Sequence, residues 1–197
     1  MHPVIQRLLE HGVVVTDGAW GTELQARGLA IGDCPDGWNL THPERVMDVA
    51  RTYVSAGSQI ILTNTFGANR IRLAAHFLAE RVDEINRRGV AISREAADGR
   101  AAVFASIGPG GKLLLNDEVT VEELHAAFEE QSRSLMHAGA DALVVETMSD
   151  LQEAQIAVAA VRNTGLPIVA CMVFDSGKNK DRTMTGITPE QAARALL

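Results

Sequence analysis

Short apolar runs alternate along this chain with longer segments whose apolar residues recur at helical spacing, and this alternation limits the fold more than any other feature. The runs are residues 13–15, 60–62, 102–105, 143–145 and 168–170. Each run is too short for a helix, and none alternates polar with apolar residues. They therefore predict strands of a parallel sheet that is covered on both faces.

Amphipathic helices are predicted between these runs. Their segments are residues 43–57, 81–98, 120–139 and 150–162. Within 120–139, Thr120 and Glu123 have the spacing of a capping box, and Gly139 is a residue type that ends helices without steric penalty. The repeated order of strand and helix predicts an α/β fold in which helices pack on a parallel sheet.

A weak internal repeat supports this order. The segments AGSQIILTNT (56–65) and AGADALVVET (138–147) align without gaps, and each joins a helix-ending Ala-Gly to an apolar strand. The alignment places Asn64 and Glu146 at matching points just beyond two strands. Because ligands of such folds bind at the carboxyl ends of the strands, we expect both side chains at a ligand-binding edge.

Polar residues and glycines also follow the other apolar runs. Asp17 follows the first run, SIGPGG (106–111) the third and Asp175 the fifth. Gly18 and Gly21 would let backbone N–H groups approach a ligand carboxylate or phosphate. The glycines of SIGPGG lack the GxGxxG spacing, so this segment predicts a turn that lines the pocket.

The same residues have structural interpretations. Glu146 either binds a ligand amine or caps the helix that begins near Asp150, and Asp17 either serves a ligand or forms a turn with Gly18. Trp20 and Trp38 flank the first loop, where they either cover a ligand or pack in the interior. The residue pattern alone does not choose between the functional and the structural interpretations.

Composition narrows the class of protein. The formal charge is −7 and the lysines and arginines form no cluster, which argues against nucleic acid as a partner. No stretch has the length of a membrane span, and the N-terminus lacks the apolar core of a signal peptide. Cys34 and Cys171 have no metal-ligand spacing, and no histidine pair has the spacing HxH or HExxH. We therefore expect a cytoplasmic protein with ordinary buried thiols.

Six stretches together resemble the homocysteine S-methyltransferase family, which includes betaine-dependent enzymes and the homocysteine domain of cobalamin-dependent methionine synthase. They are DGAWGTELQARG (17–28), WNLTHPERV (38–46), AGSQIILTNTFGAN (56–69), ASIGPGG (105–111), GADALVVETMSDLQEA (139–154) and RTMTGITPE (182–190). They follow the family's order over nearly the whole chain, and their combination is far more specific than any single motif.

The resemblance implies a (β/α)8 TIM barrel that transfers a methyl group to the sulfur of homocysteine and forms methionine. It implies zinc as the cofactor that binds the sulfur as a thiolate. Glu146 would hold the homocysteine ammonium, and the amides around Gly18 and Ala19 would hold its carboxylate. Asp17 is expected beside Glu146 as the second catalytic carboxylate. The remaining expected pocket residues are Thr63, Asn64, Thr65, Phe66 and Thr147. Betaine, S-methylmethionine and methylcobalamin are all methyl donors in the family.

The chain also departs from the family pattern. The family's three zinc-binding cysteines lie in Asn-Cys and Gly-Gly-Cys-Cys motifs, and neither motif occurs in this sequence. Only about the first five of eight βα units are expected, and the last helix opens well at Thr188 and Pro189 yet stops at Leu197. We therefore expect residues 1–197 to be the N-terminal part of a single homocysteine-binding barrel, or a shortened homologue whose open edges are covered by an oligomer or partner subunit.

Three functional hypotheses follow. The first is a zinc-dependent homocysteine methyltransferase of which this chain is the N-terminal portion. The second is a non-catalytic truncated barrel that binds an amino acid or pairs with a partner subunit. The third is a different barrel enzyme that uses Asp17 and Glu146 for acid–base chemistry.

Overall fold

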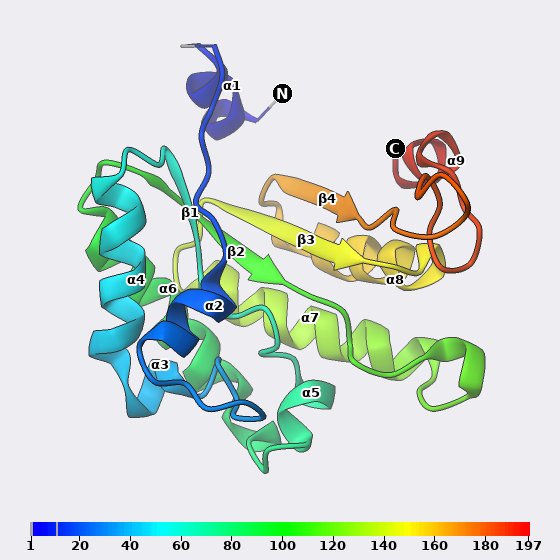
Figure 1. Ribbon diagram of the computed structural model, residues 1–197, viewed down its shortest axis with the longest axis horizontal. Coiled ribbons are helices and arrows are strands. Elements are labelled where there is room, and N and C mark those ends of the chain that lie inside the picture. Colours follow the sequence, from blue (N-terminus) through cyan, green and yellow to red (C-terminus); the bar gives the residue numbers. More distant parts are fainter. Residues whose placement is uncertain (1, 11) are drawn as a thin grey trace.

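The computed structural model describes residues 2–10 and 12–197, and of residue 115 it describes the backbone alone (Figure 1). The strands are β1 (Ile60–Leu62), β2 (Ala102–Ile107), β3 (Ala142–Met148) and β4 (Ile168–Met172). The helices are α1 (Pro3–Leu9), α2 (Trp20–Ala26), α3 (Trp38–Thr41), α4 (Pro43–Ser55), α5 (Arg70–Ala74), α6 (Val82–Ala97), α7 (Val121–His137), α8 (Leu151–Val161) and α9 (Pro189–Leu196). Three short 3-10 turns are η1 (Ala79–Arg81), η2 (Leu114–Asn116) and η3 (Arg162–Thr164).

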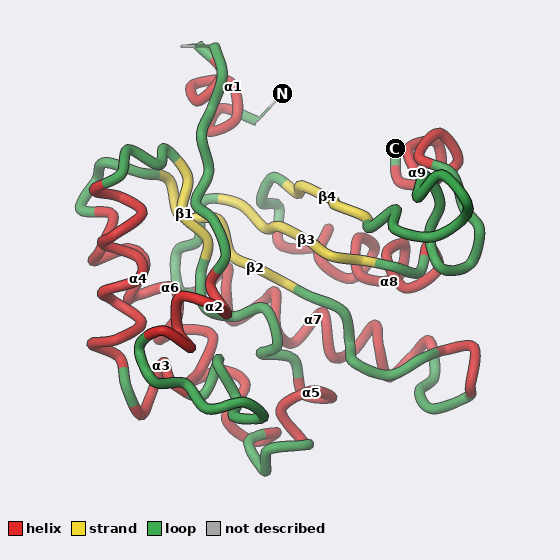
Figure 2. Tube along the Cα trace, viewed as in Figure 1, coloured by secondary structure: helices red, strands yellow, loops and turns green. Residues whose placement is uncertain are grey.

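The four strands form one parallel sheet in the order β1-β2-β3-β4 (Figure 2). Ile60 of β1 pairs with Ala102 of β2, and Phe104 of β2 pairs with Ala142 of β3. Within the described residues the sheet is open, with β1 and β4 at its edges. The predicted α/β class with a parallel sheet is confirmed.

Alternate residues of the strands face different layers. One face, which carries Ile61, Val103 and Leu143, packs against α4, α6, α7 and α8, and its side chains are fully buried. The other face carries Phe104 and Val144, and part of its apolar cover comes from side chains of α1. Because successive side chains of a strand point to opposite faces, one set of strand residues packs against the helices and the other set lies on the opposite face of the sheet.

The predicted helix signals act as expected. Thr120 accepts a hydrogen bond from the backbone of Glu123, whose side chain accepts one from the Thr120 backbone, so α7 begins with a capping box. Gly57 and Gly139 follow α4 and α7 with φ of +99° and +89°. Both matching segments thus lead from a helix through a left-handed glycine into a strand, and the predicted repeat corresponds to two equivalent units.

The strand predicted at residues 13–15 is wrong. This segment makes one parallel bridge, between Thr16 and Ile60, and the Val15 carbonyl accepts hydrogen bonds from the backbone of Gln59 and Ile60. Val13 is 88% exposed and Val15 is 54% exposed. Since little packs against these side chains, backbone pairing stops after one bridge, and the described residues hold four strands instead of five.

The predicted burial of the last strand is also wrong. Val169, Ala170 and Cys171 are exposed along β4, because no further strand pairs with this edge within the described residues. Cys171 is therefore an exposed thiol, and Cys34 is half-buried.

Of the helices that the structure describes, none is both long and apolar enough to cross a membrane.

Candidate functional site

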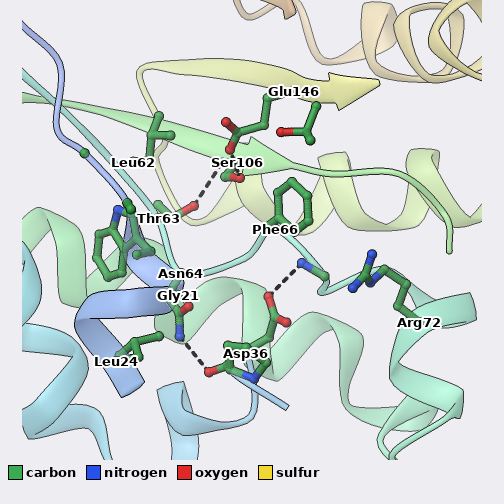
Figure 3. A pocket seen from close by; sticks show the side chains of 16 residues that line it. Gly21, Leu24, Asp36, Leu62, Thr63, Asn64, Phe66, Arg72, Ser106 and Glu146 are labelled. Carbon is green, nitrogen blue, oxygen red and sulfur yellow. Dashed lines mark hydrogen bonds between the residues drawn. The ribbon is translucent and has the colours of Figure 1, made fainter. Parts of the chain in front are cut away.

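A cavity of about 370 Å³ lies at the carboxyl edge of the sheet, where segments far apart in the sequence meet (Figure 3). Its wall comes from the loop before α2, the loop before α3, the segment after β1 and the ends of β2 and β3. The lining residues are Gly18, Ala19, Trp20, Gly21, Leu24, Pro35, Asp36, Leu62, Thr63, Asn64, Phe66, Gly67, Arg72, Ser106, Glu146 and Thr147. The volume is at the small end of the range for ligand pockets, about 300–1,000 Å³.

Glu146 enters this cavity from an irregular strand end. The register of β3 against β4 shifts between Val145 and Met148, and Thr147 has a φ of +61°. A left-handed backbone is unfavourable for a β-branched residue, so this bulge stores strain where it aims the preceding carboxylate. The Ser106 hydroxyl donates a short hydrogen bond to Glu146 Oε1.

Burial is the main influence on the charge of Glu146. Desolvation raises the pKa of its carboxyl above the ordinary value, the Ser106 hydrogen bond opposes this rise, and the negative charge of Asp17 adds to it. A half-buried carboxylate with one hydrogen bond retains free acceptor positions. An ammonium group in the cavity would use these positions and offset the cost of burial.

Asp17 joins the loop before α2 to the first strand. Its Oδ2 accepts hydrogen bonds from the Leu62 backbone at 2.7 Å and from the Trp20 indole at 2.8 Å. Burial raises the pKa of Asp17, while these two hydrogen bonds act in the opposite direction. Asp17 lies behind the lining residues, where it holds the wall and adds negative charge near Glu146.

The backbone around Gly18 and Ala19 faces the cavity. Neither N–H donates a hydrogen bond within the described part of the chain, so both remain available to an acceptor. Tyr53 donates its hydroxyl hydrogen to the Ala19 carbonyl at 2.9 Å, which holds the loop. A Cβ at Gly18 would lie 3.0 Å from the Tyr53 hydroxyl, so glycine permits this close packing.

Thr63 and Thr65 form a hydrogen-bond relay with Ser106. Thr65 donates to the Ser106 carbonyl at 2.8 Å, and Thr63 lies 2.5 Å from Thr65. Because Thr65 has used its single hydrogen, Thr63 donates to Thr65 and accepts from the Ser106 backbone at 3.1 Å. Thr63 therefore has no hydrogen left for a ligand, and Thr65 is fully buried outside the cavity lining.

Asn64 and Phe66 have different surroundings on the same segment. The Asn64 amide donates to the Pro35 carbonyl at 2.8 Å and to the Asn39 side chain at 3.0 Å, so it fastens the loop before α3. The Phe66 ring lies against Gly108, where an added Cβ would come within 2.5 Å of it. The SIGPGG turn thus supports the cavity through Gly108 and lines it through Ser106.

Of the predicted site residues, the structure brings seven to the cavity wall. These are Gly18, Ala19, Thr63, Asn64, Phe66, Glu146 and Thr147. Asp17 and Thr65 lie directly behind that wall. Trp20 lines the cavity, whereas Trp38 packs in the interior and stacks on His42 with ring centroids 4.5 Å apart.

Sequence reasoning missed two charged residues of the cavity, Asp36 and Arg72. Asp36 is 4% exposed, and its Oδ1 accepts a hydrogen bond from the Gly67 backbone at 2.9 Å. Burial raises the pKa of Asp36 to about 6, although the charge of Arg72 acts to lower it. Asp36 lies in the turn-like sequence CPDG, which contains no signal of a binding site. Ser106, the first residue of SIGPGG, lines the cavity at the segment that was predicted to line the pocket.

Comparison with known proteins identifies the family. A model described as homocysteine S-methyltransferase matches residues 14–197. The chain belongs to the homocysteine S-methyltransferase family.

Several members of this family are similar to the chain. Methionine synthase of Mycobacterium tuberculosis is 34% identical over 167 residues, which are 79% of this chain and 14% of that protein. Betaine–homocysteine S-methyltransferase 1 of Sus scrofa is 30% identical over 200 residues, covering 98% of this chain and 70% of that protein. The chain therefore spans about one seventh of the mycobacterial methionine synthase that it matches.

A solved structure of a homocysteine S-methyltransferase shares the fold. The metallated form of the homocysteine methyltransferase MmuM from Escherichia coli superposes with a TM-score of 0.83 and 24% identity. The alignment covers 99% of this chain and 74% of that one. At this identity the likeness shows the fold alone, which is of the TIM-barrel type.

Zinc is the cofactor that the resemblance implied for this family, and the described residues of this chain do not fit it. Among residues 2–10 and 12–197, no three side chains of His, Cys, Asp or Glu gather closely enough to hold a metal ion. Cys34 lies in the loop before α3, with its sulfur 4.0 Å from Asp36 Oδ2, and Cys171 lies on the exposed edge strand β4. The described residues therefore lack the three-thiolate set.

Proposed function

We propose that this chain binds homocysteine in the cavity at the carboxyl edge of its sheet, as the methyl acceptor in a reaction that forms methionine. Glu146 binds the substrate ammonium, and the free N–H groups of Gly18 and Ala19 bind the substrate carboxylate. Asp17 holds these two parts of the wall together. In the reaction, a lone pair of the sulfur forms the new S–CH3 bond, the methyl donor keeps the pair of the broken bond, and the thiol proton is released.

The placement of Glu146 is the observation that carries this proposal. A carboxylate that is desolvated, aimed by a strained bulge and oriented by Ser106 suits a cationic ligand. Gly18 and Ala19 line the same cavity, and their N–H groups have no partner in the described part of the chain, so one small volume offers an acceptor for an ammonium and donors for a carboxylate. This pair of complementary groups favours an α-amino acid over a ligand with one charge.

We further propose that residues 1–197 are the N-terminal part of a single barrel domain. The partial coverage of the porcine and Escherichia coli relatives supports this interpretation. On this view, the ligands of the zinc that activates the sulfur lie outside the chain, and so does part of the methyl-donor site. The two free thiols are compatible with a cytoplasmic protein, and an oligomer or a partner subunit is proposed to cover the edge strands.

Calorimetric titration of L-homocysteine tests the proposal, with Glu146→Gln as the decisive variant. Glutamine keeps the size of the side chain and loses its charge, so we expect the affinity to fall by about tenfold to a hundredfold, as for a hydrogen bond between charged groups of about 1.5–3 kcal/mol. Glu118→Gln, on an exposed turn before α7, is the control and should bind like the wild type. Absence of homocysteine binding to the folded wild-type chain, or equal binding by Glu146→Gln, would contradict the proposal.

A further inference from the structure

Arg72 supplies the positive charge of the cavity. Among the described residues that line it, Asp36 and Glu146 are acidic and Arg72 alone is basic. Arg72 belongs to α5, which follows β1, and in Figure 3 the Phe66 ring lies between Arg72 and Glu146. The positive charge of the cavity therefore lies at the Arg72 end, beside Asp36, and Glu146 lies at the other end.

The direction of the Arg72 side chain is set by its surroundings. The guanidinium carbon lies 5.6 Å from the centroid of the Phe66 ring, in a cation–π contact. Two glycines leave room for the side chain, because a Cβ at Gly111 would lie 2.9 Å from Arg72 Cγ and one at Gly67 would lie 3.2 Å from Arg72 Nε. The Phe66 contact orients the guanidinium of this solvent-exposed arginine.

The guanidinium N–H groups of Arg72 remain free within the described residues. Its guanidinium forms none of the ion pairs found there at 4.0 Å or less. The nearby Asp36 directs Oδ1 to the Gly67 backbone instead. A guanidinium that lines a cavity with all its N–H groups free matches a ligand carboxylate, which accepts two parallel hydrogen bonds from the planar fork.

We infer that Arg72 binds the carboxylate of the methyl donor, so that this site takes a small carboxylate-bearing donor at the end of the cavity opposite Glu146. The inference rests on the proposed function, which assigns Glu146 and the Gly18–Ala19 loop to homocysteine. Phe66 separates the two subsites and orients the guanidinium. Asp36 is a positioning residue, since it accepts a hydrogen bond from the Gly67 backbone, and the Arg72 side chain lies close to Gly67.

The test is a calorimetric comparison of wild type, Arg72→Gln and Arg72→Lys with two sets of probes. The first set is betaine and S-methylmethionine, each with and without L-homocysteine, and choline serves as the onium compound without a carboxylate. The second set is L-homocysteine alone. We expect Arg72→Gln to lose at least tenfold in affinity for the carboxylate-bearing probes, Arg72→Lys to lose less, and choline binding to be unchanged. Arg88→Gln, an exposed arginine on α6, is the matched control.

The outcomes separate this inference from the proposed function. Unchanged homocysteine affinity in Arg72→Gln, together with loss of preference for carboxylate-bearing probes over choline, supports the assignment. If Arg72→Gln weakens homocysteine binding equally, Arg72 belongs to the homocysteine subsite and the inference is overturned. It is also overturned if the wild type binds neither carboxylate-bearing probe. If these probes bind through Arg72 while homocysteine does not bind, the proposed function fails and the Arg72 site stands.

Discussion

The hydroxyl of Ser106 at the end of β2 donates a hydrogen bond to Glu146 at the end of β3. Ser106 is itself held by Thr63, which accepts from its backbone N–H, and by Thr65, which donates to its carbonyl. The ends of three neighbouring segments are thus joined in one network that finishes at a carboxylate. This network orients Glu146, and the Ser106 hydrogen bond opposes the rise in the pKa of Glu146 that burial causes.

Replacement of Ser106 by alanine is expected to weaken homocysteine binding by about tenfold, the loss of one hydrogen bond to a charged group. The hydrogen bond lowers the pKa of Glu146, so its removal raises that pKa further. Binding needs the ionised form, and we therefore expect affinity to be lost at a higher pH in the variant as the pH falls. Titrations across a pH series check this shift.

Two controls accompany the Ser106 variant. Ser132→Ala removes a buried hydroxyl on α7, whose partner is the Glu129 carbonyl, and should leave binding unchanged. Ser106→Thr retains the hydroxyl and should keep most of the affinity. An identical pH profile for Ser106→Ala and wild type would show that the hydroxyl does not govern the ionisation of Glu146.

Asp36 gives the protein a distinct dependence of stability on pH. The pKa of the Asp36 carboxyl is about 6 in the folded protein, and the ordinary value of an aspartate, which applies to the unfolded chain, is 3.8. Between these values the folded state holds a proton that the unfolded chain has released, so the contribution to stability falls as the pH rises through this window. We expect Asp36→Asn to be more stable than wild type by about 1–2 kcal/mol near neutral pH, with the difference shrinking toward about pH 4.

Urea unfolding at several pH values measures this difference. Asp33→Asn changes an exposed carboxylate of the same loop and should have no comparable effect. Lower stability of Asp36→Asn near neutral pH would mean that Gly67 and Arg72 more than compensate for the burial of the ionised carboxylate.

The left-handed backbone at Thr147 is expected to trade stability for binding. Glycine adopts a φ of +61° without a Cβ clash, so Thr147→Gly should raise the free energy of unfolding by about 0.5–1 kcal/mol. The same change relaxes the bulge that aims Glu146 and should lower homocysteine affinity several-fold. Denaturant unfolding and calorimetry on one preparation measure both effects.

Thr22→Gly provides the matched control for Thr147→Gly, because Thr22 is an exposed residue of α2 with ordinary helical backbone. There glycine should destabilise the protein by about 0.5 kcal/mol or more. If Thr147→Gly destabilises the protein as well, the bulge is not strained.

Local sequence signals determined much of the fold and part of the site. Thr120 with Glu123 marked the start of α7, and the matching Ala-Gly segments marked two equivalent helix-to-strand units, because capping and left-handed glycines depend on neighbouring residues alone. The same repeat placed Asn64 and Glu146 at strand ends, where a parallel sheet gathers its polar residues. Gly18 and Ala19 were found through the motif around Asp17.

Only the tertiary structure decided what each of these residues contacts. The run 13–15 looked like a strand, yet it forms one bridge, because a strand needs neighbours whose presence no local pattern encodes. Thr63 and Thr65 were expected to serve a ligand, and their hydrogens are used within the protein. Asp36 and Arg72 lie in segments of unremarkable sequence, and they enter the cavity because the loops before α3 and after β1 meet beside Gly67. Hydrogen bonding and burial at a site depend on contacts between distant segments, which exist only once the chain has folded.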